Sequence, residues 1–390
     1  MQALNRLLGA ISSLRLTISC LAAAFVLVFA GTLAQVHFEP LYVQEQYFQS
    51  WLVYWRPASG DYPIPVFPGG HLIGAVLLIN LIAAHIRRFS WRWNKLGIQL
   101  THLGIIIMLT GGLATDLFSV SSFMPLQKGE TKNYSESRER RELAVVDLSD
   151  PDYDQITAIP GELLAKGGEI KPDTPLPFRI VVRGYYRNSK LNTIGMEHGS
   201  TIPASTMGIG MRVAVTSIPR AIKLKEEDRM SAVVEIIPVK DGKSLGTWLV
   251  SDQIDAPQTF ECADRKWSLQ LRLARYYKPY SLTLRDFIHE VYPGTQNPKD
   301  FSSKVTLNDP VIKDSRQVRI WMNHPLRYQG DTYYQSSFLE SDSGTVLQCV
   351  RNPSYQAPYV ACVIVGLGLF YQFFLHLTGF IRRANSKKTP

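Results

Sequence analysis

The sequence has few cysteines and no closely spaced pair of them. Its four cysteines are Cys20, Cys262, Cys349 and Cys362, and none belongs to a Cys-x-x-Cys motif. This absence excludes a thioredoxin-like redox motif and covalent attachment of haem to this chain, because both need two neighbouring thiols. Cys262 and Cys349 fall in the same long polar segment, where either a disulfide or two isolated thiols fits the sequence.

Four stretches contain no Asp, Glu, Lys or Arg and are long enough to cross the hydrocarbon of a bilayer. They are residues 16–35, 70–86, 96–115 and 359–381. The mean hydropathy of −0.04 hides them, because the remaining segments are polar. The first stretch is longer than the apolar core of a signal peptide, and a second stretch follows it, so we expect it to be a retained membrane anchor.

Acidic residues are absent from the short segments at one end of these stretches, and basic residues are concentrated there. Those segments hold ten of the 42 Lys and Arg residues, and the other 32 nearly balance the 33 Asp and Glu. The ten are Arg6, Arg15, Arg87, Arg88, Arg92, Lys95, Arg382, Arg383, Lys387 and Lys388. This is the positive-inside pattern, and it predicts a plasma (inner) membrane protein with both termini in the cytoplasm.

Once these ten residues are assigned to the cytoplasmic edges, no stripe of basic residues remains that could bind nucleic acid. We therefore expect no nucleic-acid partner.

The segment between the third and fourth stretches alternates polar and apolar residues with a period close to two, which is typical of strands with one wet face. Eight such runs lie at 143–148, 178–186, 211–216, 232–239, 267–277, 280–284, 318–322 and 332–338. A β-sandwich or open barrel is expected here. Residues 161–177, rich in Gly and Pro, read as a loop inside this domain.

The predicted fold is therefore an α-helical membrane protein with four transmembrane helices, arranged three plus one, and a large extracytoplasmic mostly-β domain. Its predicted parts are 1–35 (basic edge and first helix), 36–69 (outer loop), 70–115 (second and third helices with a short basic cytoplasmic loop), 116–353 (β domain) and 354–390 (fourth helix and basic tail). The outer loop carries an aromatic run and then several prolines, which indicates an interfacial segment followed by an extended one.

Three histidines lie inside the predicted helices, all near their cytoplasmic ends. His102 sits roughly 9 Å inside the third stretch at about 1.5 Å per residue, where a polar side chain is costly and tends to face a partner or cavity. A neutral imidazole there can ligate haem iron, and His85 and His376 are weaker candidates. The alternative is a histidine that only forms a hydrogen bond to a neighbouring helix. His71, near the outer surface, reads as interfacial.

Several longer strings carry more specific information. They are Asn-Leu-Ile-Ala-Ala-His-Ile-Arg-Arg-Phe at 80–89, Thr-His-Leu-Gly-Ile-Ile-Ile-Met-Leu-Thr-Gly-Gly at 101–112, Lys-Gly-Glu-Thr at 128–131, Leu-Arg-Asp-Phe at 284–287, Asn-His-Pro-Leu-Arg-Tyr-Gln-Gly at 323–330, Tyr-Gln-Ser-Ser at 334–337 and Arg-Asn-Pro at 351–353. Together they resemble the ResB (CcsB) family of cytochrome c biogenesis proteins. The resemblance extends over nearly the whole chain.

The resemblance implies a membrane subunit of a haem synthase of the ResBC (CcsBA) type. In that family haem moves outward and is joined to the Cys-x-x-Cys-His thiols of apocytochrome c, and the partner resembles ResC (CcsA), a haem lyase subunit. The implied cofactor is haem b, bound transiently and non-covalently, with His102 as the matching ligand. The chain alone is not expected to be catalytic, and the implied activity is haem transport and cytochrome complex assembly.

Around the string at 323–330, the residues that match the family are Asn323, Pro325, Leu326, Gly330, Tyr334 and Gln335. A structural role also fits, because Pro325 and Gly330 are typical of a turn between two strands.

Two other functions of the chain stay open. One is a membrane-anchored scaffold or sensor whose β domain binds a protein without haem, and the other is a b-type electron-transfer subunit, which needs two haems stacked across the bilayer.

Overall fold

The computed structural model describes residues 8–55, 62–151, 153–172, 174–194, 202–222, 227–294, 298–339 and 343–386. Arg6, Pro57, Lys387 and Lys388, which entered the charge and loop predictions, lie outside these ranges. The chain forms two compact units. The helical unit comprises Met1–Ser119, Ile222–Glu226 and Asn352–Pro390, and the β unit comprises Val120–Ala221 and Glu227–Arg351.

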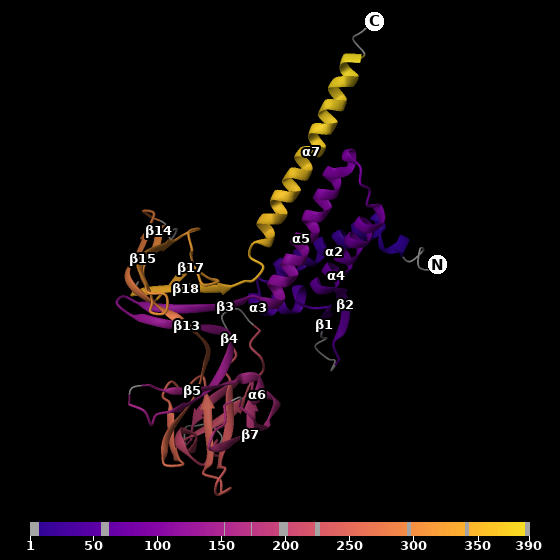
Figure 1. Cartoon of the computed structure of the whole chain (residues 1–390). Helices are drawn as coiled ribbons and strands as arrows, with labels where there is room; N and C mark the ends of the chain where they lie inside the picture. Colours follow the sequence, from indigo (N-terminus) through magenta and orange to yellow (C-terminus); the bar gives the residue numbers. More distant parts are fainter. Residues whose placement is uncertain are drawn as a thin grey trace. The chain divides into compact units, whose positions relative to one another are not determined.

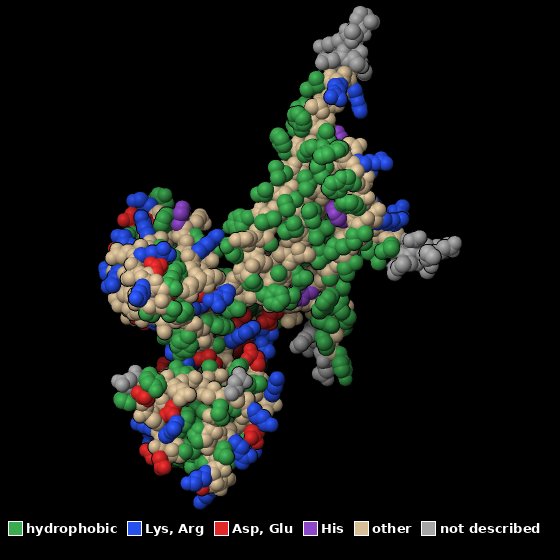
Figure 2. Space-filling model, viewed as in Figure 1, with side chains coloured by type: hydrophobic (Ala, Val, Ile, Leu, Met, Phe, Trp, Pro, Cys, Tyr) green, Lys and Arg blue, Asp and Glu red, His purple; other side chains and the backbone are tan. Residues whose placement is uncertain are grey.

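Four long helices dominate the helical unit (Figure 1). They are α2 (Leu14–Ala34), α4 (Gly70–Arg88), α5 (Leu96–Phe118) and α7 (Ala357–Ser386). Each is long and apolar enough to cross a membrane, so the four predicted apolar stretches are confirmed as helices. Hydrophobic side chains cover much of the outside of this unit (Figure 2). On α7 they include Phe370, Phe373 and Phe380, all strongly exposed, which is the surface that lipid would cover.

The connection between α2 and α4 contains regular structure that the sequence did not indicate. It forms α3 (Pro40–Val43), the π-helical turn η1 (Gln44–Phe48), and a hairpin of β1 (Leu52–Trp55) and β2 (Ile64–Pro68). A short 3-10 turn, η2 (Trp93–Lys95), precedes α5. The extended segment predicted from the prolines is thus the second strand of this hairpin. Pro65 and Pro68 have no N–H to donate, and they are tolerated here because both strands of a two-stranded ribbon are edge strands.

Helices α5 and α7 pack closely along a row of small residues. Gly97, Gly104 and Gly111 recur every seventh residue of α5, and each faces α7. Gly97 lies against Gly368 and Gly111 lies against Ala357. Small residues let two membrane helices approach closely, where van der Waals contact stabilises their association. At the end of this row, the Thr115 and Ser354 hydroxyls form a hydrogen bond of 2.8 Å.

Replacing Gly104 with leucine is expected to lower the stability of the helical unit by about 1–3 kcal/mol, the usual cost of overpacking. A Cβ at this position would lie 2.6 Å from the Val365 side chain and 2.9 Å from the Ala361 carbonyl oxygen. The measurement is the thermal unfolding midpoint of the detergent-purified chain. Gly112→Leu is the matched control, because a Cβ there meets nothing within 4 Å. Equal midpoints for the two variants would contradict this packing.

The β unit contains one large sheet, one small sheet and a separate strand pair. The large sheet holds β3 (Val120–Gln127), β4 (Thr131–Asp147), β5 (Gln155–Pro160), β12 (Gln258–Cys262), β13 (Arg265–Val291), β14 (Pro298–Asp309), β15 (Asp314–Trp321), β16 (Leu326–Tyr328), β17 (Asp331–Phe338) and β18 (Gly344–Arg351). The small sheet holds β6 (Gly168–Ile170), β7 (Phe178–Tyr186), β10 (Ser231–Pro238) and β11 (Gly246–Ser251), and the pair is β8 (Ser189–Thr193) with β9 (Val213–Ser217). The turns α6 (Gly161–Lys166) and η3 (Gly208–Met211) complete the unit, so the mostly-β prediction is confirmed.

Two hydrophobic cores divide the β unit, and the long strand β13 contributes to both. The first core lies between the small sheet and one part of the large sheet, with Phe178, Trp248 and Trp267 at its centre. The second core lies inside the rest of the large sheet, whose two end strands, β15 and β16, are connected by a tight turn in which Trp321 pairs with His324. The domain therefore combines a sandwich with a curled, barrel-like sheet.

One prediction for this unit was wrong. Residues 161–177 are not simply a loop, because α6 and β6 form within them and Leu164 and Ile170 are buried in the first core. Of the two alternatives that the sequence left open for Cys262 and Cys349, the structure has two isolated thiols and no disulfide between them. Cys262 lies in the first core and Cys349 in the second, and both are free thiols.

Candidate functional site

The structure brings two of the three predicted membrane histidines together. His85, in the last turn of α4, and His102, in the second turn of α5, have ring centroids 6.2 Å apart with an angle of 59° between the ring planes. They meet because the short connection between α4 and α5 folds the two helices back on each other. We call this end of the helical unit the basic end, because Arg87, Arg88 and Lys95 lie beside it.

The basic end contains buried polar atoms that have no partner among the described residues. They are His85 Nδ1, Gln99 Oε1 and Gln372 Oε1. Leaving a buried polar atom without a hydrogen bond costs roughly 1–3 kcal/mol, so such atoms call for an explanation. The Phe89 ring lies against His85 at 5.9 Å and the Trp91 ring follows at 6.4 Å, which gives the site an aromatic border.

His376 does not join this pair. Its Nε2 lies 3.0 Å from Gln372 Nε2 within the same helix, and its side chain is exposed. Along the row of small residues, Thr101 faces Gly368, eight residues before His376. At 1.5 Å per residue, His376 lies roughly 12 Å beyond the depth of His102. The three histidines are therefore not at one depth, and only His85 and His102 are placed to share a ligand.

A buried asparagine fixes the helix that carries His85. The side chain of Asn80 accepts a 2.6 Å hydrogen bond from the Thr17 hydroxyl and donates to the carbonyl oxygens of Ile11 and Ser13. Arg87, two turns further along α4, donates to the Ser12 hydroxyl at 3.1 Å. These contacts hold α2 against one face of α4. His85 lies about 140° around the helix from Asn80, so this anchoring turns His85 towards α5.

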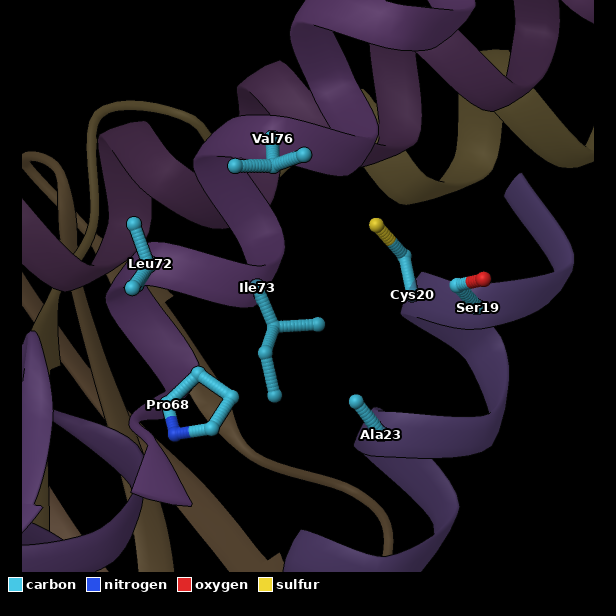
Figure 3. A pocket seen from close by; sticks show the side chains of 7 residues that line it. All are labelled: Ser19, Cys20, Ala23, Pro68, Leu72, Ile73 and Val76. Carbon is cyan, nitrogen blue, oxygen red and sulfur yellow. The ribbon is translucent and has the colours of Figure 1, made fainter. Parts of the chain in front are cut away.

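A cavity of about 260 Å³ opens between α2 and α4, away from the two histidines (Figure 3). Its lining is Ser19, Cys20, Ala23, Pro68, Leu72, Ile73 and Val76. The walls are almost entirely apolar, and no imidazole or carboxylate reaches them. The only common metal-ligating side chain in its lining is that of Cys20, whereas the basic end brings two imidazoles together, so we assign the candidate site to the histidine pair.

In the β unit, the string at 323–330 forms two tight turns. Asn323 adopts the left-handed backbone with φ of +61°, and Gly330 does so with φ of +83° between β16 and β17. The His324 ring stacks on Trp321 at 4.2 Å, and its Nδ1 lies 3.1 Å from the Met322 carbonyl oxygen. The geometry of this string is that of a folded turn, as its Pro and Gly suggested.

The neighbouring motif residues pack around these turns. Leu326 is buried in the second core, and Pro325 leads into the strand β16 that contains it. Gln335 forms hydrogen bonds to the hydroxyls of Ser303 at 2.6 Å and Thr345 at 2.8 Å. Tyr334, by contrast, is exposed on the surface of β17. Most of these contacts hold the curled sheet together.

Sequence reasoning missed a buried charge network in the second core. The Asp331 carboxylate accepts hydrogen bonds from Arg351 at 2.7 and 3.0 Å and from the Tyr280 hydroxyl at 2.9 Å, and the Lys278 ammonium lies 2.9 Å away. Burial alone would raise the pKa of Asp331, but the bonds from Arg351, Lys278 and Tyr280 hold the pKa below its usual value. The available signal was in the sequence strings, because Asp331 directly follows the string at 323–330 and Arg351 begins the string at 351–353.

Comparison with known proteins identifies relatives for part of the β unit. Residues 255–346 match the model of the ResB-like family. Protein NrfI of Wolinella succinogenes is 33% identical over 93 residues, which make up 24% of this chain and 10% of that protein. Cytochrome c biogenesis protein CcsB of a Synechococcus species is 38% identical over 78 residues, 20% of this chain and 17% of that protein.

The chain thus spans a small part of the length of the relatives that it matches. The family match covers β13 to β17 with the turns at Asn323 and Gly330, and it includes Lys278, Tyr280 and Asp331 of the buried network. The strings at 284–287, 323–330 and 334–337 lie within the matched residues, so this part of the chain is similar to the ResB-like family.

Proposed function

We propose that this chain is a membrane subunit for cytochrome c biogenesis, which binds haem non-covalently at His102 and His85 and presents it to a haem lyase partner. One of its relatives is named a cytochrome c biogenesis protein, and the family resemblance points the same way. The observation that carries the proposal is the histidine pair itself. His85 Nδ1 is buried without a partner, and the ring of His102 lies beside it.

The donor set suits the iron of a porphyrin better than a bare metal ion. Among the described residues there is no group of three or more His, Cys, Asp or Glu side chains that could hold a metal. A bare Zn²⁺ needs about four ligands, whereas haem iron brings four nitrogens of its own and needs only one or two from the protein. The His85 and His102 rings, with centroids 6.2 Å apart, are close enough to contribute to one site for haem iron.

The two imidazoles have distinct roles in this proposal. His102 would hold the haem iron from the interior of α5, and His85 would do so from the last turn of α4 through its unpartnered nitrogen. Asn80 and Arg87 act as positioning residues, because they set the rotation of α4 that aims His85 at α5. The Phe89 ring packs against the His85 ring at the basic end. Bound haem would supply the reactive vinyl groups, and their bonding to thiols belongs to the partner.

Charge gives the proposed orientation. The basic residues of the described helix ends gather at the end that holds His85 and His102, which the positive-inside rule places in the cytoplasm. The β unit, entered after α5 and left before α7, is then extracytoplasmic, and both termini are cytoplasmic. In this orientation the chain receives haem on the cytoplasmic side of the inner membrane and delivers it towards apocytochrome c outside. The partners are a lyase resembling ResC (CcsA), apocytochrome c and membrane lipid.

The test is maturation of a reporter cytochrome c in cells that express this chain with its ResC-like partner. The His85→Ala/His102→Ala double variant is expected to lower the yield of covalently haem-bound reporter at least tenfold, because the haem ligands are lost. His376→Ala is the matched control and should keep the wild-type yield, since His376 lies away from the pair. Full maturation in the double variant, at equal membrane levels, would favour a scaffold that binds no haem.

A further inference from the structure

A second pair of side chains lies one helical turn, roughly 5 Å, from the two histidines and closer to the helix ends. Arg88, the last residue of α4, follows His85 by three residues, and Gln99 precedes His102 by three residues on α5. Residues three apart on a helix are neighbours on one face. The Gln99 Nε2 donates to the backbone carbonyl oxygen of Arg88 at 3.4 Å, so the two residues meet across the helix pair.

This second pair has binding capacity that the chain itself does not use. The Gln99 Oε1 atom is buried and has no partner among the described residues. The Arg88 Nη2 donates to the backbone carbonyl oxygen of Ser12 at 3.3 Å, and a carbonyl group carries no net charge. A guanidinium has five N–H donors in a planar fork, so donors remain for a ligand.

The charge of Arg88 is not balanced by the helices around it. Residues 1–38 and 62–115, which carry α2, α4 and α5, contain no Asp or Glu. A counter-charge must therefore come from a ligand. The fork of an arginine matches the two oxygens of a carboxylate, and such charge-assisted hydrogen bonds are stronger than neutral ones.

The two layers together indicate one kind of ligand. The inner layer offers the imidazoles of His85 and His102, which suit a metal centre. The outer layer offers a guanidinium and an amide, which suit an anion. Haem combines an iron centre with two propionate carboxylates on one side of its ring. An anionic lipid would match the outer layer only, because it has no group for the imidazoles.

We propose that Arg88 and Gln99 bind the propionate carboxylates of haem and thereby fix its orientation in the site. The charged side of the ring then faces the basic end, and the side that bears the vinyl groups points away from it. This inference rests on the proposed function, since it concerns the same haem. It adds two binding residues and predicts that the chain distinguishes haem from porphyrins without free carboxylates.

The experiment titrates two porphyrins into the detergent-purified full-length chain and follows their absorption bands. One is ferric haem, and the other is its dimethyl ester, which keeps the iron and the vinyl groups but lacks both negative charges. Arg88→Gln should weaken the binding of haem at least tenfold, because a charge-assisted hydrogen bond is lost. It should bind the ester as the wild type does, which also reports that the site is intact. Gln99→Leu should weaken haem alone by roughly threefold, the effect of one neutral hydrogen bond.

Arg383→Gln is the matched control, because it removes the same charge from the last turn of α7. That helix packs on the face of α5 that carries Gly97, and His102 lies about 140° around α5 from Gly97. The control should bind both porphyrins like the wild type. The inference is overturned if Arg88→Gln weakens both porphyrins equally or weakens neither. Failure of the proposed function looks different, because the wild type would then bind neither porphyrin more tightly than the His85→Ala/His102→Ala variant does.

Discussion

Replacing His102 with alanine is expected to weaken the binding of haem to the α4–α5 site of the purified chain at least roughly 100-fold, beyond the 10–100-fold typical of losing a partner that only orients a ligand. His102 lies in the interior of α5 with its ring beside His85, so the alanine variant loses one of the two imidazoles that this site provides. His85→Ala should weaken the same site and convert bound ferric haem to a five-coordinate form. The measurement is a titration with haem, followed by absorption.

His376→Ala is the control for this titration, because it removes a membrane histidine that contacts Gln372 and not the pair. Its affinity should equal that of the wild type. Equal affinities for the His102→Ala and His376→Ala variants would show that this chain does not ligate haem through α5.

Replacing Asp331 with asparagine is expected to destabilise the β unit by about 3–5 kcal/mol, the usual cost of breaking a buried ion pair by removing one partner. The Asp331 side chain is fully buried, and the change leaves Lys278, which is 7% exposed, without its counter-charge. Arg351 also loses its carboxylate partner just before the chain leaves β18. The free energy of unfolding, measured with urea in detergent and followed by circular dichroism of the strands, tests this expectation.

Asp286→Asn is the control for this prediction. Asp286 also pairs with a lysine, Lys128 at 3.1 Å, but at the surface, where ion pairs contribute little. Its removal should leave the unfolding curve nearly unchanged. Similar destabilisation by the two variants would mean that burial of the Asp331 network does not matter.

The same network gives a pH dependence with a definite sign. Because Arg351, Lys278 and Tyr280 hold the pKa of Asp331 below its usual value, the carboxylate stabilises the fold at every pH above the unfolded value of about 3.9. That contribution is lost only as the pH falls from there through the lowered folded pKa. The wild type should therefore lose this part of its stability below about pH 4, and Asp331→Asn should lack that acid-dependent step.

The helices were predictable because a bilayer demands about 20 apolar residues in a row, and α2, α4, α5 and α7 each provide them. The strands of the β unit were harder to predict. The single strand β13 was predicted as two separate runs, 267–277 and 280–284, because Lys278 and Pro279 interrupt the alternation of polar and apolar residues. In the structure they fall where the pairing with β4 breaks, between Tyr277 and Leu282, so the missing N–H of Pro279 leaves no ladder bond unmade.

The site was partly predictable for a similar reason. A short connection places His85 and His102 at one depth, and this is local information. The depth of His376 depends on how α7 slides along α5, which Gly97, Gly104 and Gly111 set through tertiary packing. The absence of a bond between Cys262 and Cys349 also follows from topology, since their strands serve different cores. The partners of Asp331 come from distant segments, and spacing along the chain gives no sign of them.

The most direct test of the central claim is the absorption spectrum of the chain purified from cells together with its ResC-like partner. For the wild type we expect the bands of a b-type haem that extraction with acid solvent removes, because the binding is non-covalent. The His85→Ala/His102→Ala variant should lose most of that signal while it still co-purifies with the partner. An unchanged haem spectrum in the double variant, or a wild type without haem that still supports cytochrome c maturation, would contradict the account.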